Sequence, residues 1–162
     1  MVAEYRPHDP NQRTEDYVEN IARVGHPRLT MAVPLYADVD FLHDEIVGAR
    51  GAFRDTIGGL HNLALYGFTV EIRVVILALN HHRLPKLAEF IYANLPFANH
   101  VAWMGMETTG LAQQNLNRVW VDPIDYREAL EAACRYLYRR RIPTSVYNLV
   151  LCALPKSLWP LA

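Results

Sequence analysis

Four apolar segments with the composition of β-strands alternate along the chain with segments of helical spacing. The strand-like segments cover residues 29–37, 70–76, 100–106 and 144–154. The first is a nearly unbroken apolar run, typical of a strand covered on both faces, and β-branched residues dominate the second. Strand–helix alternation indicates right-handed βαβ units and a parallel sheet. Because a closed barrel has eight strands and about 250 residues, the sequence predicts an open α/β sheet or a partial (β/α) barrel with about four parallel strands.

The helical segments are marked by apolar stripes and by recognisable ends. The first helix is predicted over 14–24, with Gly25 as its left-handed cap, and the last begins at Pro123 with Asp122 as its N-cap. The expected stripes are Tyr17, Ile21 and Val24; Phe53, Ile57, Leu60 and Ala64; Leu84, Leu87, Ala88, Ile91 and Leu95; and Leu130, Ala133, Cys134 and Leu137.

Length and cysteine content predict one cytoplasmic domain over residues 1–162. About half of the residues are apolar, which is enough for a single core. The two cysteines, Cys134 and Cys152, are too few and too far apart for a disulfide framework or a metal site. We expect a polar, flexible segment over 1–15, without the apolar region of a signal peptide, and no run long enough to span a membrane.

The charge distribution gives no reason to expect a nucleic-acid partner. The formal net charge is −1, and the run from Arg139 to Arg141 is the single basic cluster. This run falls at the predicted end of a helix, where cations complement the helix dipole. We therefore interpret it as a solvated helix end rather than as a phosphate site.

The segment HDEIVGARGAFRDTIGGLHNL, residues 43–63, follows the first predicted strand and resembles a segment of radical S-adenosylmethionine (SAM) enzymes. In their peptide-modifying branch, it joins the fourth barrel strand to the fourth helix. The residues in register are His43, Asp44, Gly48, Gly51, Ala52, Phe53, Asn62 and Leu63. The next motifs, VEIRVVILALN and MGMETTGLA, are similar to the fifth and sixth strands of that family and follow in the same order.

Within that superfamily, the likeness is strongest to the radical SAM maturase of the His-Xaa-Ser peptide system. It spans roughly residues 24–162 and is carried by VPLYADVDFLHD, VEIRVVI, LAEFIYANL, HVAWMGME, YNLVLCAL and SLWPLA. The family binds SAM and a [4Fe–4S] cluster held by a Cys-x3-Cys-x2-Cys loop, which this sequence lacks. The resemblance therefore implies that the chain is the C-terminal half of a barrel and that this half binds no cluster itself. No residue of the chain is assigned a catalytic role.

The resemblance also implies which partners the chain has and which part of the barrel it supplies. The chain would contribute part of the SAM pocket and a wall for a ribosomally made peptide substrate. Its expected partner is the N-terminal half of the barrel or a second copy of the chain. As an isolated chain it is expected to be inactive. The alternative is a non-catalytic half-barrel that serves as a binding or dimerising module, because two sheet edges and one face would remain unsatisfied.

Six residues are candidates for cofactor binding, each with an ordinary structural alternative: Tyr36, Asp38, Arg73, Asn80, Glu107 and Gly110. All but Arg73 fall at or after the ends of predicted strands, where barrels place their ligands. Arg73 shares one strand face with Glu71, and it would bind a carboxylate or pair with that neighbour. Metal ligands are not expected.

Two other positions carry open alternatives. His43 and Asp44 either organise the loop by capping the following helix or take part in proton transfer, and loop organisation is the favoured interpretation. Cys152 occupies a cysteine position of the maturase subfamily, so an auxiliary cluster is conceivable, but a buried free thiol is the expected role. Cys134 is expected to pack in the core.

Overall fold

A computed structural model of the chain describes residues 10–26 and 29–162. The helices are α1 (Pro10–Val24), α2 (Asp40–Val47), α3 (Ala52–Leu65), α4 (Leu84–Asn94), α5 (Leu111–Gln114), α6 (Leu116–Val119) and α7 (Pro123–Tyr138). The strands are β1 (Thr30–Pro34), β2 (Thr69–Ile76), β3 (His100–Gly105) and β4 (Thr144–Tyr147). Three short 3₁₀ turns, His81–Arg83, Leu151–Ala153 and Lys156–Leu161, complete the described chain.

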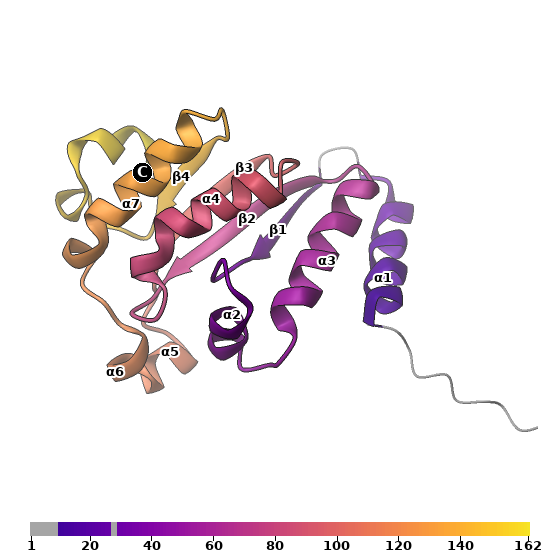
Figure 1. The fold of residues 1–162 in the computed structure, drawn as a ribbon, viewed down its shortest axis with the longest axis horizontal. Coiled ribbons are helices and arrows are strands. Elements are labelled where there is room, and N and C mark those ends of the chain that lie inside the picture. Colours follow the sequence, from indigo (N-terminus) through magenta and orange to yellow (C-terminus); the bar gives the residue numbers. More distant parts are fainter. Residues whose placement is uncertain (1–9, 27–28) are drawn as a thin grey trace, which may run out of the picture.

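The four strands form one parallel sheet in the order β1-β2-β3-β4 (Figure 1). Each crossover between neighbouring strands contains at least one helix, as parallel pairing requires. The strand order equals the sequence order, which is the arrangement of consecutive βα units in a barrel wall. The prediction of an α/β partial barrel with four parallel strands is therefore confirmed.

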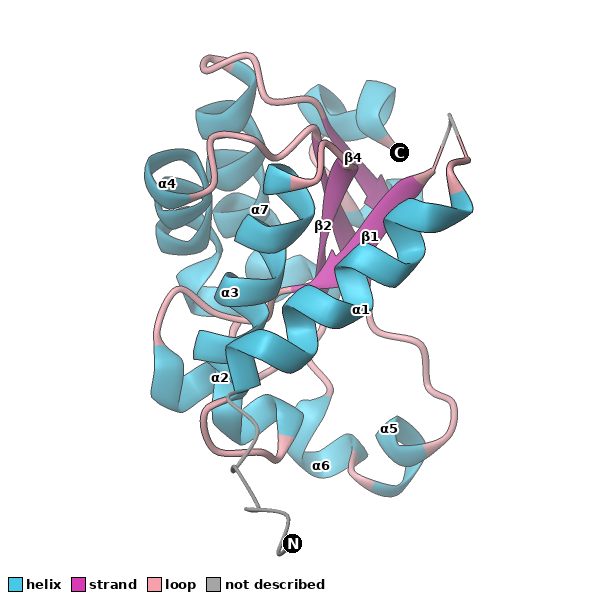
Figure 2. Cartoon of the chain, turned by 90° about the vertical axis from the view of Figure 1, so that its right-hand side faces the viewer, coloured by secondary structure: helices cyan, strands magenta, loops and turns pink. Residues whose placement is uncertain are grey.

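The helices α3, α4 and α7 lie on one side of the sheet, and they leave its other side uncovered (Figure 2). In β2, Val70, Ile72 and Val74 are fully buried toward the helices, whereas Glu71 and Arg73 point to the other side, which we call the open face. The expectation that the first strand is covered on both faces is wrong. β1 alternates exposed and half-buried residues because it is an edge strand and lines the open face.

The core lies between the sheet and these helices. The predicted stripes of α4 and α7 are confirmed, since every residue in both is buried. The stripe of the first helix is wrong: Tyr17 and Val24 are exposed, while Val18 is 2% exposed and joins the core. The cause is the packing of α1 against α3, which selects the phase of the helix that presents Val18.

Element boundaries differ from the sequence prediction in three places. The first helix begins at Pro10, so the end of the 1–15 segment is helical, and residues 1–9 lie outside the described residues. Within the segment expected to be a loop, residues 40–47 form α2. The fourth strand ends at Tyr147 because Asn148 adopts a left-handed conformation, with φ 56°, that extended pairing cannot accommodate. None of the described helices has the length and apolar content to cross a membrane.

The turn after β4 is packed directly against the end of β3. A Cβ atom at Gly105 would overlap the carbonyl oxygen of Asn148 and lie 2.6 Å from Cδ2 of Leu149. Only glycine therefore lets the chain leave β4 at this point and pass over the end of β3.

The Gly105→Ala variant is expected to lower the free energy of unfolding by about 1–3 kcal/mol, because backbone and side chain must both move. Urea denaturation measures the change. Gly67→Ala is the comparison variant without a clash: no atom lies within 4 Å of its added Cβ, and its φ of 75°, a left-handed conformation that Gly105 does not share, costs about 1 kcal/mol by itself. Gly105→Ala should therefore lower the stability by more than Gly67→Ala does. A Gly105→Ala protein as stable as the wild type would contradict the close packing described above.

Candidate functional site

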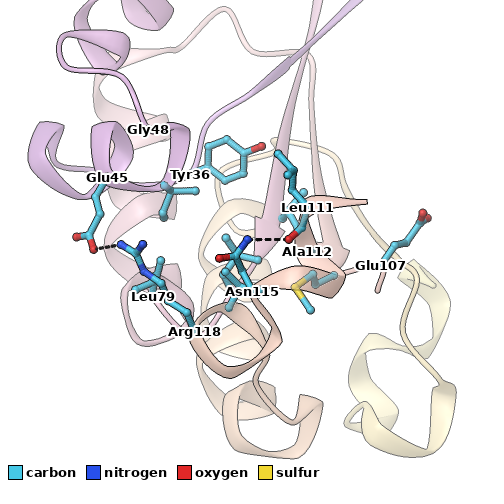
Figure 3. A pocket seen from close by; sticks show the side chains of 14 residues that line it. Tyr36, Glu45, Gly48, Leu79, Glu107, Leu111, Ala112, Asn115 and Arg118 are labelled. Carbon is cyan, nitrogen blue, oxygen red and sulfur yellow. Dashed lines mark hydrogen bonds and ion pairs between the residues drawn. The ribbon is translucent and has the colours of Figure 1, made fainter. Parts of the chain in front are cut away.

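A cavity of about 490 Å³ opens at the carboxyl ends of the strands (Figure 3). Val75, Leu77 and Met106 provide apolar lining from the ends of β2 and β3 and the residues that follow them. Val75 lies on the open face, because side chains alternate along a strand. The cavity therefore lies where α/β barrels bind their ligands.

Helical segments that follow the strands form the sides of this cavity. Glu45 and Ile46 contribute from α2, and Leu111, Ala112 and Asn115 contribute from the α5–α6 segment. Arg118 of α6 donates to Glu45 at 2.7 Å, so an ion pair links the two sides (Figure 3). Both side chains are about half exposed, and this pair therefore contributes little stability but fixes the position of the segment.

Tyr36, at the end of β1, is one of the predicted residues that line the cavity. Its backbone N–H donates to Nδ1 of His43 at 3.2 Å, and its carbonyl oxygen accepts from Asn80 at 2.9 Å. The tyrosine backbone is thus held from both sides. The two partners come from α2 and from the turn after β2.

His43 and Asp44 organise the segment between β1 and α3. The Asp44 carboxylate accepts from the backbone N–H groups of Gly51 and, at 2.8 Å, Phe53, so it caps the start of α3. These two hydrogen bonds hold the pKa of Asp44 below its usual value. His43 is buried, and burial lowers its pKa, although the Asp44 charge opposes that shift. The structural role accounts for both residues.

Asn80 joins the ends of β1 and β2 through its buried side-chain amide. Its Nδ2 donates to the carbonyl oxygens of Tyr36 at 2.9 Å and Val75 at 3.0 Å, and its Oδ1 accepts from the N–H of Leu77 at 2.8 Å. These three hydrogen bonds occupy both amide donors. Asn80 therefore positions the cavity wall, and its predicted contact with a cofactor stays a prediction.

Asp38 pairs with Arg83 rather than lining the cavity. Two parallel hydrogen bonds of 2.7 Å join the carboxylate to the guanidinium, from Nε to Oδ1 and from Nη2 to Oδ2. This geometry is the strong, bidentate form of the ion pair. It also raises the pKa of Arg83. The pair ties the turn after β1 to the turn before α4.

Glu107 and Gly110 follow β3 at the rim. Glu107 lines the cavity, and its Oε1 accepts from Asn148 at 2.9 Å. Gly110 has φ 56° and ψ −131°, a backbone conformation restricted in practice to glycine, and α5 begins directly after it. Tyr36 and Glu107 are thus the two predicted residues that line the cavity, and Gly110 sets the direction of one of its walls.

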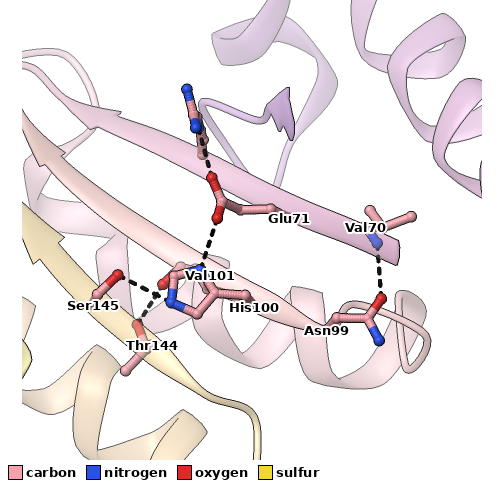
Figure 4. Close-up of polar contacts among 8 residues, drawn as sticks. Val70, Glu71, Asn99, His100, Val101, Thr144 and Ser145 are labelled. Carbon is pink, nitrogen blue, oxygen red and sulfur yellow. Dashed lines mark hydrogen bonds and ion pairs between the residues drawn. The ribbon is translucent and has the colours of Figure 1, made fainter. Parts of the chain in front are cut away.

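Arg73 lies farther down β2 on the open face, in a network that crosses three strands. Its Nε donates to Oε1 of Glu71 at 2.7 Å, and Oε2 of Glu71 lies 3.1 Å from Nδ1 of His100 (Figure 4). The network continues from Nε2 of His100 to the hydroxyl of Ser145 at 3.0 Å. Arg73 thus has the neighbour expected from the sequence, and binding of a carboxylate by it stays a prediction.

Sequence reasoning missed several of these residues. Gly105 and His100 lie within the motif HVAWMGME, but no local pattern indicates the contacts of Gly105, Arg83, His100 or Ser145, because their partners lie far away in the chain. The alternation of Glu71 and Arg73 was the one available signal, since it indicated that the strand face opposite the helices carries charge. Assigning His100 and Ser145 to the same face requires the register of the strands.

The described residues do not fit an iron–sulfur cluster. Across residues 10–26 and 29–162, no group of three or more histidine, cysteine or acidic side chains could hold a metal ion. Cys134 is buried, as expected, and burial raises the pKa of its thiol to about 12. The expectation of a buried Cys152 is wrong: it is exposed, because the chain after β4 forms a 3₁₀ turn at the surface rather than a strand.

Comparison with known proteins supports the fold. No family model and no curated protein matches the sequence. Among solved structures, the chain is similar to the crystal structure of a radical SAM methyltransferase from Sphaerobacter thermophilus, with a TM-score of 0.52 and 19% sequence identity. The match covers 82% of this chain and 38% of that chain. The chain therefore has the fold of part of that enzyme.

The Asn80→Ala variant is expected to lower the free energy of unfolding by about 2–4 kcal/mol, because buried backbone groups lose their partners. Chemical denaturation provides the measurement. Asn94→Ala is the matched control, since Asn94 is exposed and its amide donates to the carbonyl oxygen of Phe90 at the surface of α4, so its removal should cost no more than about 0.5 kcal/mol. Equal effects of the two substitutions would refute the linking role of Asn80.

The stability of the protein should fall as the pH drops below about 6.5, the usual pKa of histidine. The pKa of His43 is lowered in the folded state, so the unfolded chain takes up a proton that the folded protein resists. His81, whose pKa burial also lowers, acts in the same direction.

Denaturation curves between pH 7 and pH 5 test this dependence. His43→Asn retains an acceptor oxygen for the Tyr36 N–H but cannot titrate, so its stability should change less with pH than that of the wild type. His61→Asn removes an exposed histidine and should keep the wild-type slope. The same slope in His43→Asn and wild type would show that His43 is not responsible.

Proposed function

We propose that this chain belongs to the radical SAM superfamily and forms the C-terminal part of its barrel. In this proposal, the chain supplies part of the SAM pocket and a wall for the substrate. The observation that carries it is the cavity at the carboxyl ends of four parallel strands, in a fold shared with part of a radical SAM methyltransferase. The chain spans 38% of that enzyme, so the activity of a whole barrel is part of the proposal.

The cavity lining suits a nucleoside with a charged tail. Val75, Leu77 and Met106 offer an apolar surface for a purine ring, whose faces are buried against such side chains. Glu107 supplies a carboxylate near the rim, which would attract a cationic sulfonium group, and Asn115 supplies an amide. SAM bound in this way would provide the adenosyl group whose radical abstracts hydrogen in this superfamily.

The proposal does not extend to the cluster. The described residues provide no thiolate triplet, so the [4Fe–4S] centre would be held by another part of the assembly. The chain's own residues would position the nucleoside, while Asn80 keeps the two strands beneath it aligned. A ribosomally made peptide, as in the His-Xaa-Ser systems that the sequence motifs resemble, is the proposed substrate along the open face.

A second candidate is a half-barrel that binds a partner or dimerises without catalysis. The observation in its favour is the edge strand β1, which has no neighbour on one side within the described residues. Pro34 ends this strand and limits further pairing at that end, because proline has no N–H to donate. A partner would therefore pair with the first part of β1 or cover the open face.

Isothermal titration calorimetry with SAM tests the pocket. We expect measurable binding at millimolar ligand in the wild type, because only part of the pocket is present. Binding should be lost in Ala112→Trp, which fills the cavity. Leu65→Trp adds the same side chain at an exposed position of α3 and should bind as the wild type does.

A second measurement covers the cluster: after incubation with iron and sulfide, the chain should show no [4Fe–4S] absorbance. A stable, stoichiometric cluster would contradict the proposal that another part of the assembly holds the [4Fe–4S] centre. If folded wild-type protein releases or absorbs no heat on titration with SAM, the proposal that the cavity binds SAM is refuted. If the chain binds no SAM and sediments as a dimer in sedimentation velocity, the non-catalytic half-barrel is favoured instead.

A further inference from the structure

Three neighbouring strands place a carboxylate, an imidazole and a hydroxyl in a continuous chain on the open face (Figure 4). Oε2 of Glu71 on β2 lies 3.1 Å from Nδ1 of His100 on β3. On the other side of the ring, Nε2 lies 3.0 Å from Oγ of Ser145 on β4. The order carboxylate, histidine, serine is the relation of orienting group, general base and nucleophile.

The partners of His100 fix the direction of both hydrogen bonds. An ionised carboxylate can only accept, so Nδ1 of His100 carries the proton and donates it to Glu71. In the neutral ring, Nε2 then has a free lone pair, and the Ser145 hydroxyl donates to it. The imidazole is therefore in the tautomer that can remove a proton from Ser145.

The sheet itself imposes this arrangement. Glu71 is paired with His100 in the β2–β3 register, and Ser145 is paired with Ala102, two residues beyond His100 on the same face. Arg73 holds the second oxygen of Glu71 at 2.7 Å and so orients the carboxylate. Each group is thus carried by a strand rather than by a mobile loop, which favours a fixed geometry.

The group is also open to small molecules. His100 has a side-chain exposure of 26%, and Ser145 is half-buried on the side of the sheet that no helix covers. None of the three residues lines the cavity at the strand ends. Chemistry at Ser145 is therefore independent of the proposed SAM pocket.

We propose that Ser145 is a base-activated nucleophile that accepts an acyl group from an activated ester or thioester. Oγ of Ser145 forms a bond to the carbonyl carbon of the donor, and the bond from that carbon to the leaving oxygen or sulfur breaks. His100 takes the hydroxyl proton through Nε2 and returns it to the leaving group. The products are an O-acylserine and a free alcohol or thiol, without oxidation or reduction.

The surroundings of Ser145 define the class of donor. Ser145 lies within β4, where successive backbone N–H groups point to opposite sides of the strand, so two adjacent N–H groups do not converge on a tetrahedral oxyanion. The rate gain then comes from the general base, which contributes about 10²–10⁴-fold. Donors with good leaving groups, such as aryl esters and thioesters, match this level of assistance, whereas amides do not.

The chain contains its own control, because it has only two serines, Ser145 and Ser157. The Ser157 hydroxyl donates to the Glu131 carboxylate at 2.7 Å, with no histidine between them. The Ser157 hydroxyl therefore has only a carboxylate as its partner. The Ser145 hydroxyl instead contacts the imidazole of His100, which can accept its proton and which the Glu71 carboxylate orients. The two serines therefore differ in the one feature that the proposal requires.

The test uses 4-nitrophenyl acetate as the acyl donor, in a Cys152→Ala background that removes the exposed thiol. Intact mass and peptide mapping follow acetylation over time. We expect Ser145 to be acetylated about 10²-fold faster than Ser157. His100→Asn should reduce the Ser145 rate by about 10²-fold or more, and Glu71→Gln should reduce it by a smaller factor. Ser157→Ala should leave it unchanged.

Circular dichroism establishes that each variant is folded, and the comparison of the two serines in the parent protein needs no variant at the site. Equal acetylation of Ser145 and Ser157 would overturn the proposal. So would an unmodified Ser145 in protein whose lysines are acetylated, or an unchanged rate in folded His100→Asn.

Discussion

The amide of Asn80 connects the parts of the structure on which the cavity depends. It bonds the carbonyl oxygens at the ends of β1 and β2 and the N–H of Leu77, so two adjacent strands end at a fixed distance from each other. In a parallel sheet, the carboxyl ends carry the ligand site, and each strand leaves there into an irregular segment. A buried amide is well suited to this position, because it satisfies donors and acceptors together.

Coverage on only one side of the sheet explains the composition of the strands. Toward the helices, β2 presents Val70, Ile72, Val74 and Ile76, which are fully buried. On the open face, the same strand begins with Glu71 and Arg73 and continues with Val75 at the cavity. Polar groups thus occupy the amino-terminal part of that face, and apolar groups occupy the carboxyl-terminal part. A charge without a helix above it keeps its contact with water, which lowers the desolvation penalty of the polar part.

The sequence predicted the features that depend on local patterns, and it failed where tertiary contacts decide. The buried stripe of α4 and the Asp122 cap of α7 follow from spacing and from residue type, and both are confirmed. The predicted phase of α1 is wrong because Tyr17 and Val18 are adjacent apolar residues, and packing on α3 selects between them. The apolar run after Asn148 has the composition of a strand, but periodicity alone cannot distinguish an extended segment from a surface turn. The His100–Ser145 contact links residues 45 positions apart, and no local pattern encodes it.

The two proposed sites share the open face but differ in the physics they require. A nucleoside pocket depends on apolar surface and on walls held in position, which Val75, Met106 and the α5–α6 segment provide at the strand ends. A base-activated serine depends on the direction of two hydrogen bonds, which the register of β2, β3 and β4 provides nearer the amino-terminal ends. Glu71 and Val75 are four residues apart on β2, a separation of about 13 Å along an extended chain. Substitutions in one site therefore leave the other's contacts in place, and each can be tested without disturbing its neighbour.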